Sequence, residues 1–402
     1  MNNKIILLTK DALLRTYLPV YGNKFWQTPN IDALARKGTK FNNHYTAAPS
    51  TAMSFSSMFT GKYAYQFDRK LYSKLSEKDE SETIFDILNS KGYKCHIVWS
   101  PNYMTKALPY AKTFGEPNTK FHSIDINQPV GPHLTSVVPL ERNKLLESQT
   151  MNLIYDIIDK LKKESDLLFL WIHLPHVLLG RKSYGDDIDL LDDIVGKLRN
   201  AFGDESIYLS ADHGHMNGSD SKWGYGFDLN ENAIKIPLIT PKFNNITTIN
   251  NLTSSIDLRD IILSHKVPKH DYVISETAYY CQLHRKMAII KDKYKYVFNK
   301  KENSEMLYDL NWDPSESVNL LEMKVYDIDR RRYNKLDEVY FYPFWEEVII
   351  ELNYFRKIKS LIWKECYKNS FGKFLWIVLN HIKKAILHIY NKIMLKKKRV
   401  RK

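Results

Sequence analysis

Short apolar runs alternate along the chain with segments in which apolar residues recur every three or four positions. The apolar runs predict buried β-strands at 5–9, 95–99, 167–173, 206–210 and 237–240. The periodic segments predict amphipathic helices at 30–37, 82–91, 150–163 and 185–202. Strands that alternate with helices are typical of a mostly parallel sheet with helices on both faces. We therefore predict an α/β protein built as a three-layer sandwich.

The pattern changes near residue 266. Strands predicted at 272–276, 286–291 and 295–298, followed by a turn-rich stretch at 311–314, indicate a small C-terminal antiparallel sheet. Beyond it Lys, Arg, Tyr, Trp and Ile dominate, which favours several helices. The predicted organisation is a main domain at 1–265, a small antiparallel subdomain at 266–322 and a helical basic tail at 323–402.

Charge is distributed unevenly along the 402 residues. The formal net charge is +13, and the stretch from Lys373 to Lys402 holds ten Lys or Arg and no acid, so the remainder carries about +3 (13 − 10). Residues 371–402 combine apolar positions with this basic end. Three interpretations remain open. The helix lies on an anionic membrane surface, packs on the catalytic body with a frayed basic end, or binds a polyanion. No recognition motif supports nucleic acid as the partner.

Two further features bear on the compartment. The chain has three cysteines, without metal-ligand spacing and odd in number, which fits a reducing environment. The apolar run at 5–8 is too short for a signal peptide, and no segment reaches the roughly 18 apolar residues of a membrane span. We expect a cytoplasmic protein, held peripherally at the inner membrane face if the tail binds lipid.

The stretch after the strand at 206–210 carries the strongest chemical signal. It reads Ser-Ala-Asp-His-Gly-His, so that Asp212, His213 and His215 follow a buried strand within four residues. Asp and His side by side can converge on one cation when the backbone turns, and Gly214 would permit that turn. Asp11 follows the first strand, and the carboxyl ends of parallel strands gather sites at one edge of a sheet.

Two other clusters complete the candidate site. Thr51 follows Pro49 and is expected at a helix N-terminus, where unpaired N–H groups and the helix dipole favour an anion. A plain N-cap would look the same. His173 and His176 flank a proline after the strand at 167–173; one of them reads as a core histidine and His176 as part of a pocket wall.

These residues make one physical hypothesis. Asp11, Asp212 and His213 hold a divalent ion that also binds the Thr51 oxygen and lowers its pKa. Thr51 then attacks a phosphorus or sulfur centre and forms a covalent ester. Three further side chains are candidates for holding anionic oxygens or protonating the leaving group: His176, His215 and Lys222.

In several stretches the chain resembles the sulfatase family of the alkaline phosphatase superfamily. The similar stretches are Thr-Pro-Asn-Ile-Asp at 28–32, Asp-His-Gly at 212–214, the segment at 223–238 and Leu-Tyr-Asp-Leu-Asn-Trp-Asp-Pro at 307–314. They occur in family order. The resemblance implies an alkaline phosphatase-like fold, one bound divalent cation and a covalent ester intermediate. By position, Asp11, Asp212 and His213 match metal ligands, Thr51 matches the nucleophile and His176 a substrate contact.

The departures from the family pattern alter the expected chemistry. Sulfatases have a Cys or Ser that becomes formylglycine, with an Arg four residues later; here these positions are Thr51 and Phe55, and the usual double aspartate is Asp11-Ala12. Relatives often have a His where Tyr225 stands, so we expect one metal ion. The imidazole of His213 favours Zn or Mn as the bound ion, with Mg or Ca as alternatives.

The segment 51–60 resembles the nucleophile segment of lipid A phosphoethanolamine transferases, which favours phosphate over sulfate. The sequence thus predicts a hydrolase or transferase acting on an anionic phospho- or sulfo-ester, with a glycan or lipid-linked glycan suggested by family analogy alone. A sulfatase that works without formylglycine is one alternative. A catalytically degenerate member that binds an anionic glycan is the other.

Overall fold

The structure is a computed structural model of the chain, which divides into two compact units at Met1–Ile328 and Asp329–Lys402. It describes residues 3–67, 81–99, 119–123, 140–164, 166–174, 188–218, 222–277, 286–322 and 335–366. Statements below about what is absent refer to these ranges.

The first unit is built on an eight-stranded sheet with the order β10-β2-β9-β6-β1-β5-β3-β4. Its pairs are parallel except for the two that β9 makes, with β2 and β6. The strands are β1 (Lys4–Lys10), β2 (Thr39–Tyr45), β3 (Lys94–Trp99), β4 (Thr119–Ser123), β5 (Leu168–Leu174), β6 (Ile207–Ala211), β9 (Leu238–Thr240) and β10 (Thr248–Ser254). The predicted mostly parallel sheet is confirmed.

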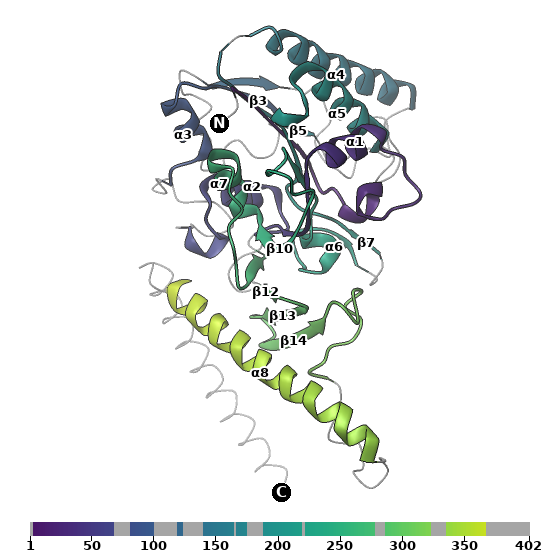
Figure 1. Ribbon diagram of the computed structural model, residues 1–402, viewed down its shortest axis with the longest axis vertical. Helices are drawn as coiled ribbons and strands as arrows, with labels where there is room; N and C mark the ends of the chain where they lie inside the picture. Colours follow the sequence, from purple (N-terminus) through teal and green to yellow (C-terminus); the bar gives the residue numbers. More distant parts are fainter. Residues whose placement is uncertain are drawn as a thin grey trace, which may run out of the picture. The chain divides into compact units, whose positions relative to one another are not determined.

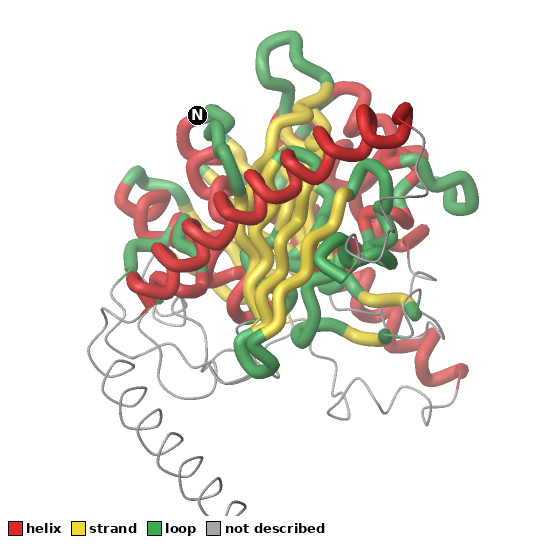
Figure 2. The backbone as a smooth tube through the Cα atoms, turned by 90° about the horizontal axis from the view of Figure 1, so that it is seen from below, coloured by secondary structure: helices red, strands yellow, loops and turns green. Residues whose placement is uncertain are grey.

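Helices cover both faces of this sheet (Figures 1 and 2), because alternate residues of each central strand point to opposite faces. One hydrophobic cluster joins Ile6 and Leu8 of β1 to α1 (Pro29–Lys37), α4 (Leu140–Leu161) and α5 (Ile188–Phe202). A second cluster joins Ile5 and Leu7 to α2 (Thr51–Thr60), α3 (Ile84–Ser90) and α7 (Leu258–Ser264). The three-layer α/β architecture is therefore confirmed.

Two of the strands that sequence patterning missed are polar. β2 reads Thr-Lys-Phe-Asn-Asn-His-Tyr and β10 reads Thr-Ile-Asn-Asn-Leu-Thr-Ser, so neither has an apolar run. They pair with each other at one end of the sheet, where Asn42 and Asn43 bond to Asn250 across the pair. One of these bonds joins two side chains and the other joins a side chain to a backbone carbonyl. The sequence alone did not reveal these strands because they lack an apolar pattern.

A small antiparallel sheet follows, in the order β11 (Val273–Glu276), β12 (Lys286–Lys291), β13 (Tyr294–Asn299) and β14 (Ser304–Asp309). Its apolar face packs on α6 (Glu231–Ile234) and on Met216 of the hairpin formed by β7 (Met216–Asn217) and β8 (Trp223–Gly224). The fully buried Lys295 pairs with Glu316 at 2.5 Å and with Glu231 at 3.5 Å. Apolar packing and the Lys295–Glu231 ion pair thus join the small sheet to α6.

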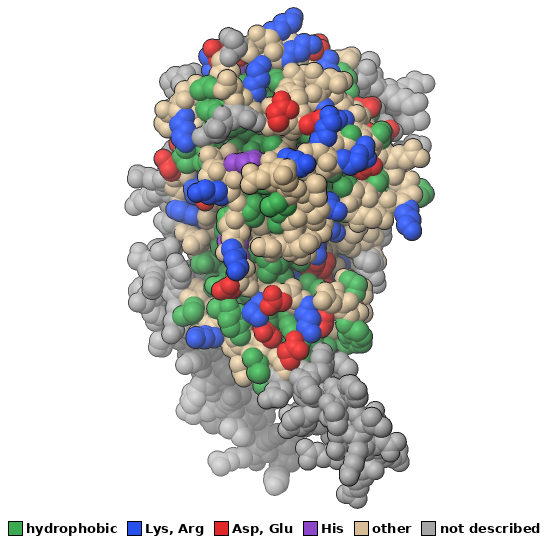
Figure 3. Space-filling model, in the orientation of Figure 1, with side chains coloured by type: hydrophobic (Ala, Val, Ile, Leu, Met, Phe, Trp, Pro, Cys, Tyr) green, Lys and Arg blue, Asp and Glu red, His purple; other side chains and the backbone are tan. Residues whose placement is uncertain are grey.

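Short 3-10 turns fill several connections, at Arg15–Tyr17, Pro19–Tyr21, Ala64–Gln66, Asp204–Ser206 and Ser255–Asp257. On the face seen in Figure 3, cationic and acidic side chains are interspersed. That mixture matches the small net charge expected for the chain without its basic end.

The second unit contains α8 (Lys335–Cys366), a helix of 32 residues. Val348, Phe355 and Ile362 are buried, whereas Ile349 and Leu361 are more than half exposed. In the described part of the chain no helix combines the length and apolar character needed to cross a bilayer. The predicted membrane-surface segment 371–402 lies outside the described residues, so that prediction remains one.

One buried carboxylate fixes the position of α1 relative to α5. Asp192 of α5 is 3% exposed and accepts hydrogen bonds from Asn30 N at 3.1 Å, Asn30 Nδ2 at 3.0 Å and Ile31 N at 2.8 Å. It thereby caps the first turn of α1, where Thr28 makes no side-chain cap bond.

We expect Asp192→Ala to lower the free energy of unfolding by about 1–3 kcal/mol, because buried N–H groups lose their acceptor. Urea unfolding followed by circular dichroism measures this. The control is Asp193→Ala, which removes the exposed neighbouring carboxylate and should change stability by no more than about 0.5 kcal/mol. Equal effects of the two changes would contradict the capping role.

Candidate active site

The register of the central strands brings Asp11 and Asp212 together. β1 lies between β5 and β6, and Lys10 at its end is opposite Leu174 on one side and Ala211 on the other. The next residues along β1 and β6 are Asp11 and Asp212. Two segments about 200 positions apart thus deliver carboxylates to the same edge of the sheet.

The loop after β6 is held against α6. Gly214 N donates to Ala233 O at 2.9 Å and His215 N donates to Asn232 O at 3.0 Å. A Cβ atom at position 214 would lie 1.9 Å from Asn232 O, so only glycine permits this approach. Gly214 does not have a positive φ. The glycine is therefore required by its close packing against Asn232, and not by the special turn that the sequence predicts.

His213 faces both carboxylates and the Thr51 hydroxyl. Its Nδ1–H donates to Gly214 O at 2.8 Å, which leaves the Nε2 lone pair directed into the site. Nε2 lies 3.3 Å from Thr51 Oγ1, 3.4 Å from Asp212 Oδ2 and 3.7 Å from Asp11 Oδ1. The four predicted residues therefore meet in space, and the side chains of Asp11, Asp212 and His213 are called the candidate metal centre below.

Thr51 is the first residue of α2, as predicted. Ser50 before it is extended, and the next turn is closed by Ser54 N donating to Ser50 O at 2.9 Å. Every residue of α2 is buried, so the helix is fixed on the sheet with its N-terminal end beside the candidate metal centre. The N-terminal dipole and free N–H groups there favour an anionic group next to the Thr51 oxygen.

The electrostatics of the centre call for a cation. Burial and the neighbouring Asp212 raise the pKa of Asp11 to about 7, and burial raises the pKa of Asp212 to about 7. Asp11 Oδ1 and Asp212 Oδ2 are buried without a hydrogen-bond partner among the described residues. Burial also lowers the pKa of His213, so its imidazole is neutral. Two buried carboxylates beside a neutral imidazole and a hydroxyl fit a divalent ion.

The remaining predicted residues have different surroundings. His215 lies beside His213, and burial lowers its pKa to about 4, so the ring offers a neutral donor or acceptor at pH 7. Lys222 Nζ forms an ion pair with Asp228 Oδ2 at 2.8 Å, and Lys286 shares the same oxygen at 3.2 Å. His176 lies outside the described residues. The roles of these three therefore remain predictions.

Two further side chains near the centre were not among the predicted site residues, although Tyr225 was noted as a departure from the family pattern. Tyr225 packs its ring on His213 at 4.5 Å between centroids and on His215 at 5.8 Å. The sequence pattern favours a core position for His173. In the structure one of its ring nitrogens lies within 4.8 Å of carboxylate oxygens of Asp11 and Asp212. Its place at the end of the strand next to β1 was the available signal, but the apolar run around it masked that signal.

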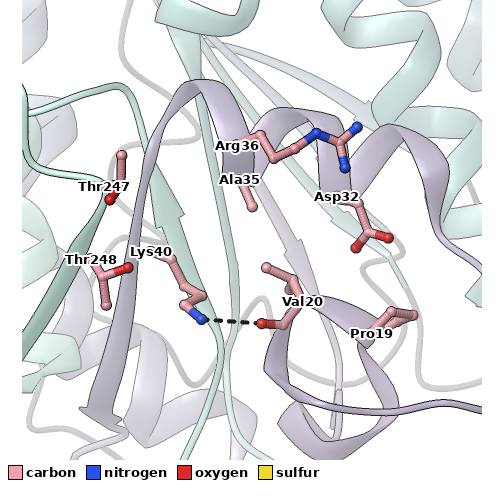
Figure 4. Close-up of a pocket in the computed structure, with 8 residues that line it drawn as sticks. All are labelled: Pro19, Val20, Asp32, Ala35, Arg36, Lys40, Thr247 and Thr248. Carbon is pink, nitrogen blue, oxygen red and sulfur yellow. Dashed lines mark hydrogen bonds between the residues drawn. The ribbon is translucent and has the colours of Figure 1, made fainter.

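A separate hollow of about 320 Å³ lies elsewhere on the domain (Figure 4). Lys40 donates there to Val20 O at 3.2 Å, and Asp32 and Arg36 come from α1. Lys40 and Thr248 stand at the starts of their strands, so this hollow lies at the opposite end of the sheet from Asp11. None of its lining residues belongs to the candidate metal centre, which remains the candidate active site.

The fold defines a class of protein, the alkaline phosphatase-like α/β sandwich, which it shares with solved sulfatase structures. The chain matches the Sulfatase family over residues 3–265. Because this match includes well over half of the chain, the protein belongs to the sulfatase family.

Relatives and solved structures agree with that assignment. Human N-acetylgalactosamine-6-sulfatase is 24% identical over 236 residues, which is 48% of this chain and 45% of that protein. The phosphonate monoester hydrolase of Agrobacterium radiobacter has a TM-score of 0.61 at 14% identity, covering 90% of this chain and 96% of that one. A 2-O GAG sulfatase has a TM-score of 0.64 at 14% identity, covering 92% and 93%. The chain spans less than half the length of the curated relatives it matches.

Protons should compete with the metal ion for the candidate metal centre. Because the pKa values of Asp11 and Asp212 are raised to about 7 in the metal-free protein, both carboxyls retain protons below that pH. We expect Mn²⁺ affinity to rise between about pH 5 and pH 8 and to level off above it. Calorimetry at each pH measures the affinity and the protons released. An affinity that stays constant over this range would contradict the assignment.

Proposed function

We propose that this protein is a metal-dependent hydrolase or transferase that forms a covalent ester on Thr51, with phosphate esters preferred over sulfate esters. The observation that carries the proposal is the position of the Thr51 hydroxyl, 3.3 Å from His213 Nε2, whose ring lies beside the buried Asp212 and the partly buried Asp11. A hydroxyl needs activation to become a nucleophile, and this arrangement of donors is suited to supply it.

The residues would divide the work as follows. Asp11, Asp212, His213 and the Thr51 oxygen would hold a divalent ion, which when bound supplies positive charge and lowers the pKa of a coordinated oxygen. The Thr51 hydroxyl lies within reach of two proton acceptors, His213 Nε2 and the Asp212 carboxylate. The N-terminal N–H groups of α2 would face the anionic oxygens of the substrate.

The reaction would proceed in two steps. Thr51 Oγ1 loses its proton and forms a bond to phosphorus, while the bond from phosphorus to the ester oxygen breaks and the alcohol leaves with one proton. Water or a second alcohol then attacks phosphorus, and the Thr51 oxygen regains a proton as it leaves. The first acceptor gives hydrolysis and the second gives transfer, so one site serves both outcomes.

Two observations support phosphate over sulfate. Position 51 is a threonine, which cannot become formylglycine, and position 55 is a buried Phe instead of the Arg of sulfatases. The solved neighbour that hydrolyses phosphonate monoesters shares the fold and is a reason to include that substrate class in a screen. A sulfatase that uses the unmodified hydroxyl is the alternative, since the curated relatives are sulfatases.

The organic part of the substrate is proposed to be a glycan. One curated relative is named for N-acetylgalactosamine-6-sulfate and one solved neighbour for a GAG, both of which are sugars. Phe227, which is 41% exposed, follows the site residue Tyr225 and offers an aromatic surface suited to the apolar face of a sugar ring.

Thr51→Ala should abolish turnover, with a loss of about 10³-fold or more, because no other group replaces the nucleophile. The assay uses purified protein loaded with Mn²⁺ or Zn²⁺ on aryl phosphate, phosphodiester, phosphonate monoester and aryl sulfate substrates. Intact-protein mass spectrometry after a rapid quench should show one added phosphoryl group, mapped to Thr51, in the wild type only.

Ser50→Ala is the matched control, because Ser50 is an adjacent buried hydroxyl and should be dispensable. Turnover of the sulfate ester alone would overturn the phosphate preference. Full turnover by Thr51→Ala would overturn the nucleophile. Binding of an anionic glycan without any turnover would identify a catalytically degenerate member of the family.

A further inference from the structure

His173 is buried at the end of β5, immediately beside the candidate metal centre. The parallel register places it opposite Thr9 of β1, two residues before Asp11. One of its ring nitrogens lies within 4.8 Å of carboxylate oxygens of both Asp11 and Asp212. His173 is 1% exposed, so its imidazole contributes nothing to the surface.

The hydrogen bonds of Thr9 set the orientation of this imidazole. His173 Nδ1 lies 3.0 Å from Thr9 Oγ1, and the same oxygen accepts the indole N–H of Trp171 at 2.9 Å. The Thr9 hydroxyl also has a backbone acceptor, Ile172 O, at 3.4 Å. When it donates there, Nδ1–H of His173 donates to Thr9 and the Nε2 lone pair points away from Thr9. This is the arrangement by which proteins fix the tautomer of a metal-binding histidine.

Aromatic rings hold His173 in place on its other sides. Phe55 meets the imidazole edge-to-face at 4.7 Å between centroids, Trp99 does so at 5.6 Å, and Trp171 stacks on it at 6.1 Å. The ring is therefore fixed by packing on three sides and by Thr9 on a fourth. A ligand that is fixed before the ion arrives costs little entropy on binding.

Ala12 gives a reason for an additional donor. This residue follows Asp11, has a left-handed backbone (φ 56°) and uses its N–H to bond Asp212 Oδ1 at 3.0 Å. Its methyl group offers no oxygen to an ion. Among the described residues, ligand atoms of Asp11, Asp212 and His173 all lie within 4.8 Å of one another, and His213 Nε2 lies 3.4 Å from Asp212 and 3.7 Å from Asp11.

We propose that His173 is a further ligand of the metal ion through Nε2 and supplies the donor that Ala12 lacks. This inference rests on the proposed metal-dependent function. Together with His213 it gives the centre two imidazole nitrogens beside carboxylate and hydroxyl oxygens. Such a donor set favours Zn²⁺, Co²⁺ or Mn²⁺ over Ca²⁺, which prefers oxygen ligands alone.

The decisive experiment uses the folded wild-type chain. Protein labelled with ¹⁵N-histidine and loaded with ¹¹³Cd²⁺ should show one-bond coupling from cadmium to the ring nitrogens of two histidines, assigned as His173 and His213. Coupling to His213 alone would overturn the inference and leave the proposed function intact. Failure of the wild type to bind any divalent ion would instead overturn the proposed function.

Variants provide an independent measurement. His173→Ala should weaken Zn²⁺ and Co²⁺ by at least about tenfold, the lower end of the cost of losing even an outer partner of a metal ligand. It should also change the visible absorption of bound Co²⁺ and affect Ca²⁺ least. Competition with a chromophoric chelator gives the affinities. An unchanged Co²⁺ spectrum and affinity would contradict ligation by His173.

His44→Ala is the matched control. His44 is also fully buried and bonds through Nδ1 to a threonine, Thr253 Oγ1, at 3.0 Å, but it stands on β2 outside the candidate metal centre. The His44→Ala change removes an equivalent imidazole and an equivalent hydrogen bond. An effect that comes only from lost stability should therefore appear in both variants. A loss of metal affinity confined to His173→Ala separates ligation from folding.

Discussion

The central constraint on this structure is the cost of burying two carboxylates next to each other. Asp11 and Asp212 lie at adjacent strand ends, and each has an oxygen without a hydrogen-bond partner in the described structure. Their pKa values of about 7 express that cost in the absence of an ion. Unpaired buried charge is costly unless other groups compensate it, so the surrounding elements matter as the parts that hold the two carboxylates in place.

The supporting elements are rigid ones. The left-handed Ala12 and the His213 backbone both donate N–H groups to Asp212 Oδ1, at 3.0 and 2.7 Å, and so fix that carboxylate. Gly214 allows the loop to contact α6, and the small sheet in turn packs on α6. Thr51 is fixed by a helix that is buried along its whole length. The site therefore depends on packing far from its own residues, which is a common requirement for precise positioning.

The candidate active site departs from the family pattern at several positions. The sulfatase family match spans both strand-end motifs, yet the nucleophile position, its partner four residues later and the second aspartate all differ from the usual pattern. Phe55, at the position of the usual Arg, lies in an aromatic group with Trp99 and Trp171 that surrounds His173. Phe55 therefore contacts the histidine that lies beside the candidate metal centre.

The sequence by itself determined the alternation of strands and helices, the parallel sheet and four of the residues that meet at its edge, because apolar periodicity and strand-end polar motifs are local signals. It missed β2 and β10, whose polar faces have no local signal, and it left His173 among the core residues. Only the tertiary structure decided that His173 stands beside Asp11, since the register between β1 and β5 joins residues more than 160 positions apart. Contacts of that kind depend on strand pairing and packing, which no short window of sequence contains.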